Sequence, residues 1–134
     1  MEWGHPRNYA KEKIMSTEEQ ETGWTGGKNA FGDFAPGMVH YTDKVLFDEV
    51  WERAGLSKRD RSLVTVAALT ATGKLDQLKF HLGFARRNGV TDDELKEALL
   101  QLSFYTGWPN GMGATTVLKN IIEDEDWARA SPDR

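Results

Sequence analysis

The sequence predicts an all-α protein, and two observations carry this prediction. Apolar residues recur at helical spacing through most of residues 36–124, in segments separated by glycines such as Gly73, Gly89 and Gly107. In addition, no run of four or more residues alternates cleanly between apolar and polar side chains, as a half-buried strand would. A β-sheet therefore has no support in this chain.

The first expected helix follows Pro36 and ends near Gly55. Its apolar residues are Met38, Tyr41, Val45, Leu46, Val50 and Trp51. A second helix begins at Ser57 and Asp60, which have the spacing of a capping box, and continues through residues 63–71. Because residues 63–71 are apolar on nearly every side, we expect this helix to be central.

The third expected helix spans residues 74–88 and ends at Gly89, a residue suited to a left-handed helix cap. One stripe of this helix should be buried, formed by Leu75, Leu78, Leu82 and Ala85. Gly83 lies in the middle of the helix, where a glycine costs about 1 kcal/mol relative to alanine. This glycine suggests either close packing or an open surface over a site.

Two further helices complete the prediction. Thr91 and Glu94 form a second capping box, which opens a helix that ends at Gly107 because Pro109 cannot continue it. Its inward residues are Leu95, Ala98, Leu99 and Leu102. The last helix is expected over residues 110–124, with apolar positions at Met112, Val117, Leu118, Ile121 and Ile122.

The length of the chain suits one compact domain with one core. Its 134 residues are 39% hydrophobic. We expect a helical domain over residues 33–127 and a short C-terminal tail over residues 128–134. Residues 1–32 form a polar N-terminal arm, which is either a mobile tail or a segment that docks on a neighbouring subunit. The aromatic residues of this arm are Trp3, Tyr9 and Trp24.

Composition excludes several classes of function. The formal net charge is -4, and lysines and arginines are scattered among carboxylates, so nucleic acid is not an expected partner. The chain has no cysteine, which excludes disulfides, thiolate nucleophiles and zinc sites with cysteine ligands. The first residues lack an apolar signal core, and no apolar run approaches the ~20 residues that span a bilayer. We therefore expect a cytoplasmic protein with no membrane partner.

Several short motifs follow one another between Arg61 and Pro109. In order they are Arg61, His81 with Ala85, Asn88-Gly89-Val90-Thr91, Glu94, Glu97 and Tyr105-Thr106-Gly107-Trp108-Pro109. This series resembles the carboxymuconolactone decarboxylase family over residues 50–122, and the resemblance implies a helical bundle of the alkylhydroperoxidase D-like type. The related alkylhydroperoxidase D proteins act through a Cys-x-x-Cys pair. A peroxidase activity of that kind is impossible in a chain without cysteine.

The apolar surface predicts a homo-oligomer. Residues 63–71, together with Phe80 and Phe84 beside the buried stripe, leave more apolar surface than a small domain can cover. The family resemblance implies a trimer of dimers.

Eight residues are candidates for the site. The catalytic candidates are His81 and Tyr105, and the substrate-binding candidates are Arg61, Gln77, Phe80, Glu97, Phe104 and Trp108. His81 matches the functional histidine of the family and could exchange a proton near neutral pH, although a histidine packed at an interface is the simpler alternative. The aromatic residues around Tyr105 could line a concave surface or belong to the core.

Two of the polar candidates each allow two interpretations. Arg61 could bind a carboxylate through its planar fork, or form a salt bridge with Glu97 or Asp60. Family decarboxylases often carry a carboxylate four residues before the histidine, where this chain has Gln77. An amide cannot take up a proton as a carboxylate can, so Gln77 favours a non-catalytic member of the family.

The resemblance implies a carboxy-lyase that acts on a small carboxylated lactone in aromatic-compound catabolism. No cofactor or metal is expected, because the lactone carbonyl can accept the electrons of the departing carboxylate. Arg61 would hold the remaining carboxylate, Tyr105 would stabilise the dienolate oxygen, and His81 would protonate a ring carbon. Phe80, Phe104 and Trp108 would form an apolar wall. The alternative is a non-catalytic or ligand-binding member of the family on the same oligomeric scaffold.

Overall fold

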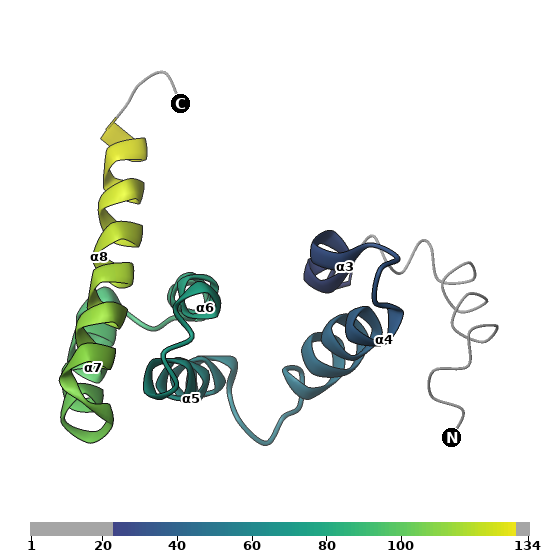
Figure 1. Ribbon diagram of the computed structural model, residues 1–134, viewed down its shortest axis with the longest axis horizontal. Helices are drawn as coiled ribbons and strands as arrows, with labels where there is room; N and C mark the ends of the chain where they lie inside the picture. The colour runs from purple at the N-terminus through teal and green to yellow at the C-terminus, as the bar shows by residue number, and fades with distance from the viewer. Residues whose placement is uncertain (1–22, 131–134) are drawn as a thin grey trace. The chain divides into compact units, whose positions relative to one another are not determined.

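The structure is a computed structural model that describes residues 23–130, with side chains through residue 125. Its helices are α3 (Gly26–Phe31), α4 (Pro36–Val39), the π-helix η1 (His40–Val50), α5 (Lys58–Ala71), α6 (Leu75–Arg87), α7 (Asp92–Thr106) and α8 (Trp108–Ala130) (Figure 1). No strand occurs between residues 23 and 130, so the all-α prediction is confirmed there. None of these helices is long and apolar enough to cross a membrane.

The chain divides into two compact units, Met1–Gly55 and Leu56–Arg134. The first unit contains α3, α4 and η1, and the second contains α5 to α8. The boundary falls inside residues 33–127, which the sequence suggested as one helical domain.

In the first unit, a buried carboxylate holds α3 on η1. Asp43 accepts hydrogen bonds from the backbone N–H groups of Gly27 (2.7 Å) and Lys28 (3.0 Å), in the first turn of α3. A Cβ atom on Gly27 would lie 2.8 Å from Oδ1 of Asp43, so the close approach requires glycine. The ring of Trp24 stacks on Phe47 at a centroid distance of 4.0 Å. Within residues 23–32 of the expected arm, Gly27 is buried and Trp24 packs on Phe47, while residues 1–22 lie outside the described part.

The π-helix η1 corrects the expected first helix. The backbone N–H of Trp51 donates to the carbonyl of Leu46, five residues earlier, at 2.9 Å. The buried side chains recur every four residues and are Val39, Asp43, Phe47 and Trp51. Most of the apolar residues expected on an α-helical period are exposed, namely Met38, Tyr41, Leu46 and Val50. The wider turn changes which side chains share a face, so an α-helical reading misplaces the buried face.

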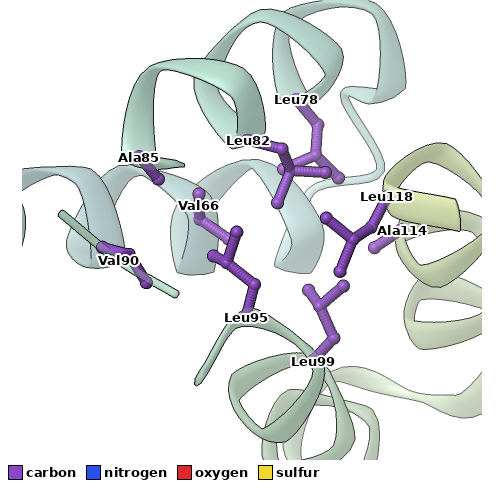
Figure 2. Packing of buried hydrophobic residues seen from close by; sticks show 9 residues of the cluster. All are labelled: Val66, Leu78, Leu82, Ala85, Val90, Leu95, Leu99, Ala114 and Leu118. Atoms are coloured by element: carbon purple, nitrogen blue, oxygen red, sulfur yellow. The ribbon is translucent and has the colours of Figure 1, made fainter. Parts of the chain in front are cut away.

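The second unit has its own apolar core, in which side chains from α5, α6, α7 and α8 meet (Figure 2). The buried cluster comprises Val66, Leu78, Leu82, Ala85, Val90, Leu95, Leu99, Ala114 and Leu118. Each fully buried leucine stabilises the fold by about 1.5–3 kcal/mol. Both α6 and α7 pack against α5 and α8 but scarcely against each other, so they occupy opposite corners of this unit.

Two expectations about the second unit need correction. Leu75 was expected on the buried stripe of α6, yet it is exposed because it is the first residue of the helix, where it lies beside Gly113 of α8. The helix α5 is not buried on every side. Its fully buried residues are Ser62, Val66 and Thr70, whereas Val64 is 62% exposed.

The helix ends agree with the capping motifs. Thr91 and Glu94 exchange two hydrogen bonds (3.0 and 3.1 Å), which confirms the capping box at the start of α7. Gly89 ends α6 with a φ of +97°, a conformation that favours glycine. The start of α8 differs from the prediction, because this helix begins directly after Gly107, and it continues to Ala130.

Candidate active site

His81 lies near the middle of α6, on the edge that faces α5. Asn88 marks this edge, because its Nδ2 donates a hydrogen bond to Oγ of Ser62 on α5 (3.0 Å). His81 precedes Asn88 by about two helical turns, so both side chains leave α6 on the same side. The neighbouring face of α6 carries the fully buried Leu78 and Leu82. His81 therefore stands at the border between the core and the surface.

Apolar surroundings favour the neutral form of His81. The imidazole is half-buried, and desolvation lowers its pKa below the ordinary value of 6.5. The ring of Phe80 meets it edge-on at 5.0 Å, and the ring of Phe84 lies 6.2 Å away, between centroids. At pH 7 the imidazole of the protein alone is mainly neutral. A carboxylate bound nearby would favour the imidazolium form.

An aromatic wall, formed by Phe80 and Phe84, covers the outer side of α6 next to His81. The two rings stack with a centroid distance of 5.5 Å and an interplanar angle of 29°. The guanidinium carbon of Arg87 lies 5.3 Å from the centroid of Phe84 and 5.9 Å from that of Phe80. Both the imidazole of His81 and the guanidinium of Arg87 therefore contact the two rings of the wall.

A hollow of about 580 Å³ adjoins the wall, between α6 and the second half of α8. Its lining residues are Asp76, Lys79, Phe80, Gly83, Arg87, Ile121 and Glu125. A Cβ atom added to Gly83 would meet nothing within 4 Å. Of the two explanations for this glycine, close packing is wrong and an open surface is confirmed.

Arg61 lies in the first turn of α5, where its Nε donates a hydrogen bond to the carbonyl oxygen of Leu56 (3.2 Å). Arg61 directly precedes Ser62, which accepts a hydrogen bond from Asn88 at the end of α6. Asn88 follows His81 by about 10 Å along α6, so Arg61 lies nearer to the end of α6 than to His81. Its neighbour Arg59 forms ion pairs with Glu94 on α7 and with Asp60.

The aromatic candidates gather at a different place, the corner where α7 ends and α8 begins. Phe104 and Trp108 meet edge-to-face at 5.6 Å, and Trp108 lines a second hollow of about 450 Å³. Phe104 is 76% exposed and Tyr105 is 80% exposed, so neither belongs to the core. A Cβ atom on Gly111 would overlap Oγ of Ser103, which shows how closely α7 and α8 approach at this corner.

The predicted site residues thus form two groups in one chain. Gln77 and Phe80 lie with His81 on α6, with Gln77 exposed one turn before the histidine. The second group, at the α7–α8 corner, comprises Phe104, Tyr105 and Trp108. Glu97 is exposed on α7. Because α6 and α7 occupy opposite corners, one copy of the second unit does not join Tyr105 to His81.

Two carboxylates near the end of α6 stabilise the fold through ion pairs. Arg86 forms ion pairs with Asp92 (2.7 Å) and Glu125 (2.8 Å), and the Asp92 hydrogen bond is the main reason why the pKa of Arg86 is raised. These contacts tie the end of α6 to α7 and α8. Within the described residues, no group of three or more histidines and carboxylates is arranged to hold a metal ion.

The sequence analysis did not single out Arg87. The signal available was its spacing, because Phe80, Phe84 and Arg87 follow one another at i, i+4 and i+7, the positions of one helical stripe. Spacing alone does not show that the guanidinium packs over both rings.

Comparison with known proteins extends the resemblance seen in the sequence. The profile of the "Carboxymuconolactone decarboxylase family" matches residues 36–120. The chain is 40% identical over 92 residues to 4-carboxymuconolactone decarboxylase of Acinetobacter baylyi, covering 69% of each protein. It is 36% identical over 97 residues to nitrosuccinic acid decarboxylase npaB of Metarhizium robertsii, covering 72% of this chain and 67% of that protein. An uncharacterized 15.0 kDa protein of Paracoccus denitrificans is 30% identical over 85 residues.

Proposed function

Because the chain belongs to the carboxymuconolactone decarboxylase family, we propose that it is a cofactor-free decarboxylase of a small carboxylated lactone in aromatic-compound catabolism. The observation that best supports this proposal is the half-buried, desolvated His81 beside an aromatic wall. An imidazole in such a place can exchange a proton with a substrate that the wall shields from water.

The names of two relatives describe chemically related reactions. One relative is named for 4-carboxymuconolactone and the other for nitrosuccinic acid. Each compound has an internal electron acceptor, which is an unsaturated lactone in the first and a nitro group in the second. An internal acceptor makes a cofactor unnecessary, because it takes up the electron pair of the breaking carbon–carbon bond.

The reaction has two steps. The bond between the ring carbon and the departing carboxylate breaks, CO₂ leaves, and the electron pair moves through the ring double bond to the lactone oxygen. A proton from His81 then bonds to a ring carbon as the electron pair returns. The apolar wall favours the first step, because charge is more spread out in the transition state than in the carboxylate.

His81 must carry a proton to act as the donor. Desolvation keeps its pKa low in the protein alone, whereas a bound substrate with negative charge raises it. Binding therefore recharges the imidazole at the moment when a proton is needed.

The α7–α8 corner contributes to the proposed site only when copies of the chain associate. Tyr105 would stabilise the dienolate oxygen, and Phe104 and Trp108 would extend the apolar wall. Tyr105 can reach a substrate at His81 only from another copy of the chain. A homo-oligomer, which the resemblance suggests to be a trimer of dimers, would complete the site in this way.

A non-catalytic, ligand-binding role is the second candidate. The observation that favours it is Gln77, which lies one turn before His81 and cannot take up a proton as a carboxylate could. Such a protein would retain the aromatic wall and bind a small acid without releasing CO₂.

The test is CO₂ release from 4-carboxymuconolactone and from nitrosuccinate, with the product analysed by NMR in D₂O. A decarboxylase should release CO₂ and place one deuterium on the carbon that carried the departing carboxylate or on its conjugated position. Saturable binding of either acid without CO₂ above the rate in buffer would favour the ligand-binding role and contradict the decarboxylase.

A further inference from the structure

Two cations at the hollow beside α6 have no carboxylate partner within the described part of the chain. Arg87 and Lys79 both line this hollow, and neither forms an ion pair there. Glu125, which also lines the hollow, is bound by Arg86 at 2.8 Å. Asp76, the remaining acidic lining residue, forms no ion pair with either cation. As far as the described side chains are concerned, the hollow can therefore accept an anion without first breaking an ion pair of Arg87 or Lys79.

Arg87 is also held in position. Its guanidinium lies over both rings of the aromatic wall, at 5.3 Å from Phe84 and 5.9 Å from Phe80. Packing over aromatic faces orients the guanidinium plane, and a planar guanidinium can bind a carboxylate with two parallel hydrogen bonds. An oriented side chain loses less conformational entropy when it binds a ligand than a freely moving one.

The hollow has room for a small organic acid. Its volume is about 580 Å³, and Gly83 leaves part of its surface without a side chain. Phe80 and Ile121 supply apolar surface for the body of such a molecule.

We propose that Arg87, assisted by Lys79, binds a carboxylate of the substrate in this hollow, with the body of the acid against Phe80 and Ile121. Arg87 would thus bind the substrate carboxylate that the sequence analysis assigned to Arg61. His81 does not line the hollow; it lies six residues before Arg87, about 9 Å along the helix axis and about 120° around it, so the acid must cross the aromatic wall to reach the imidazole. The identity of the acid as a substrate rests on the proposed function.

The first test separates binding from chemistry. Arg87→Gln should raise KM for 4-carboxymuconolactone about tenfold or more while kcat changes little, because the residue holds a part of the substrate that does not react. Arg87→Lys keeps the charge and loses the planar fork, so its KM should lie between those of the wild type and Arg87→Gln. Arg59→Gln removes a guanidinium charge at the Glu94 ion pair, away from the wall, and is the control.

Gly83 provides a second, independent variant. Gly83→Leu should fill the hollow and raise KM for 4-carboxymuconolactone, and Gly83→Ala, which adds only one methyl group, should raise it less; nothing lies within 4 Å of an added Cβ atom, so α6 can accept either side chain.

The second test needs no turnover. Isophthalate, a planar and unreactive dicarboxylate, should bind the wild-type protein with a Kd on the order of 1 mM and shift the amide NMR signal of Gly83. Arg87→Gln should abolish this shift, and Arg59→Gln should retain it. Absence of binding to the wild-type protein, or an unchanged shift in Arg87→Gln, would overturn the proposal.

The two tests also distinguish the two proposals. If isophthalate binding depends on Arg87 but no acid releases CO₂, the carboxylate site stands and the decarboxylase is contradicted. If CO₂ is released and Arg61→Gln raises KM while Arg87→Gln does not, the decarboxylase stands and Arg61 is the carboxylate ligand.

Discussion

The outer face of α6 and the corner between α7 and α8 both expose aromatic rings, but they differ in what surrounds those rings. On α6, Phe80 and Phe84 stack on each other and contact both His81 and Arg87. At the corner, Phe104 and Tyr105 are about four-fifths exposed, and Phe104 packs only on Trp108 among the described aromatic contacts.

This difference separates two uses of apolar surface. Aromatic rings that hold a titratable group and a cation in defined places can bind and transform a polar ligand. Rings that project into solvent without such neighbours are typical of surfaces that associate with another protein chain. The following predictions can break or sharpen this division, from the largest expected effect to the smallest.

The largest effect should come from the imidazole. His81→Ala should lower turnover of an accepted acid about 100-fold or more, the usual scale for loss of a general acid or base, without disturbing the core. Steady-state kinetics and a thermal melt measure the two effects. Unchanged turnover with an unchanged Tm would mean that His81 is only a packing residue. The proposed difference in function between the outer face of α6 and the α7–α8 corner would then be wrong.

The corner should control assembly. We expect no monomer at micromolar concentration, and Phe104→Lys should weaken association about tenfold or more, since a charge replaces an apolar contact. The lysine lies in the last turn of α7, where a cation is favourable, so the fold should persist. Sedimentation equilibrium gives the masses, with Gln101→Lys as the control on the same helix. A wild-type protein that sediments as a single species of 15.1 kDa would rule out this use of the corner.

Gln77→Glu sharpens the comparison on the α6 side. A carboxylate one turn before His81 should raise the pKa of the imidazole, because a nearby negative charge favours the protonated form. Gln77 is exposed, so the gain in turnover near neutral pH should be only about twofold, the scale of a surface i, i+4 pair. An NMR titration of His81 in both proteins is the measurement. If its pKa does not move, Gln77 does not face the imidazole.

The smallest effect concerns stability and pH. The pKa of His81 is lowered in the folded protein, so the unfolded chain binds more protons between that lowered pKa and the ordinary value of 6.5. Stability should therefore be fully retained above pH 6.5 and decrease as the pH falls through this window. Urea unfolding at several pH values measures this slope, and His81→Gln should flatten it. A wild-type slope of opposite sign would mean that the folded protein favours the charged imidazole.

Periodicity predicted the second unit well, because a stripe of leucines reports directly which side of an α-helix is buried. Leu78, Leu82, Leu95 and Leu99 are all fully buried. The same reasoning failed for η1, where hydrogen bonds to the fifth preceding residue change the register of side chains. Nothing in the composition of residues 40–50 distinguishes such a helix from an α-helix.

The candidate site was predictable only in part. His81 was a candidate from the sequence because it matches the functional histidine of the family. An open surface at Gly83 was one of two interpretations of that glycine. Sequence could not choose between Arg61 and Arg87 as a carboxylate ligand, because the choice depends on which guanidinium meets aromatic rings in space. For the same reason, it could not separate the α6 candidates from those at the corner.

The hydrogen bonds that Asp43 accepts from the first turn of α3 affect amide hydrogen exchange. The N–H groups of Gly27 and Lys28 point at a carboxylate that is only 4% exposed, so their protons can exchange with solvent only after this contact opens. The short helix α3 would otherwise exchange its first amides rapidly. These two amides consequently report the opening of the first unit, while the amide of Leu99 reports that of the second. Their exchange rates in one sample reveal whether the two units open together or separately.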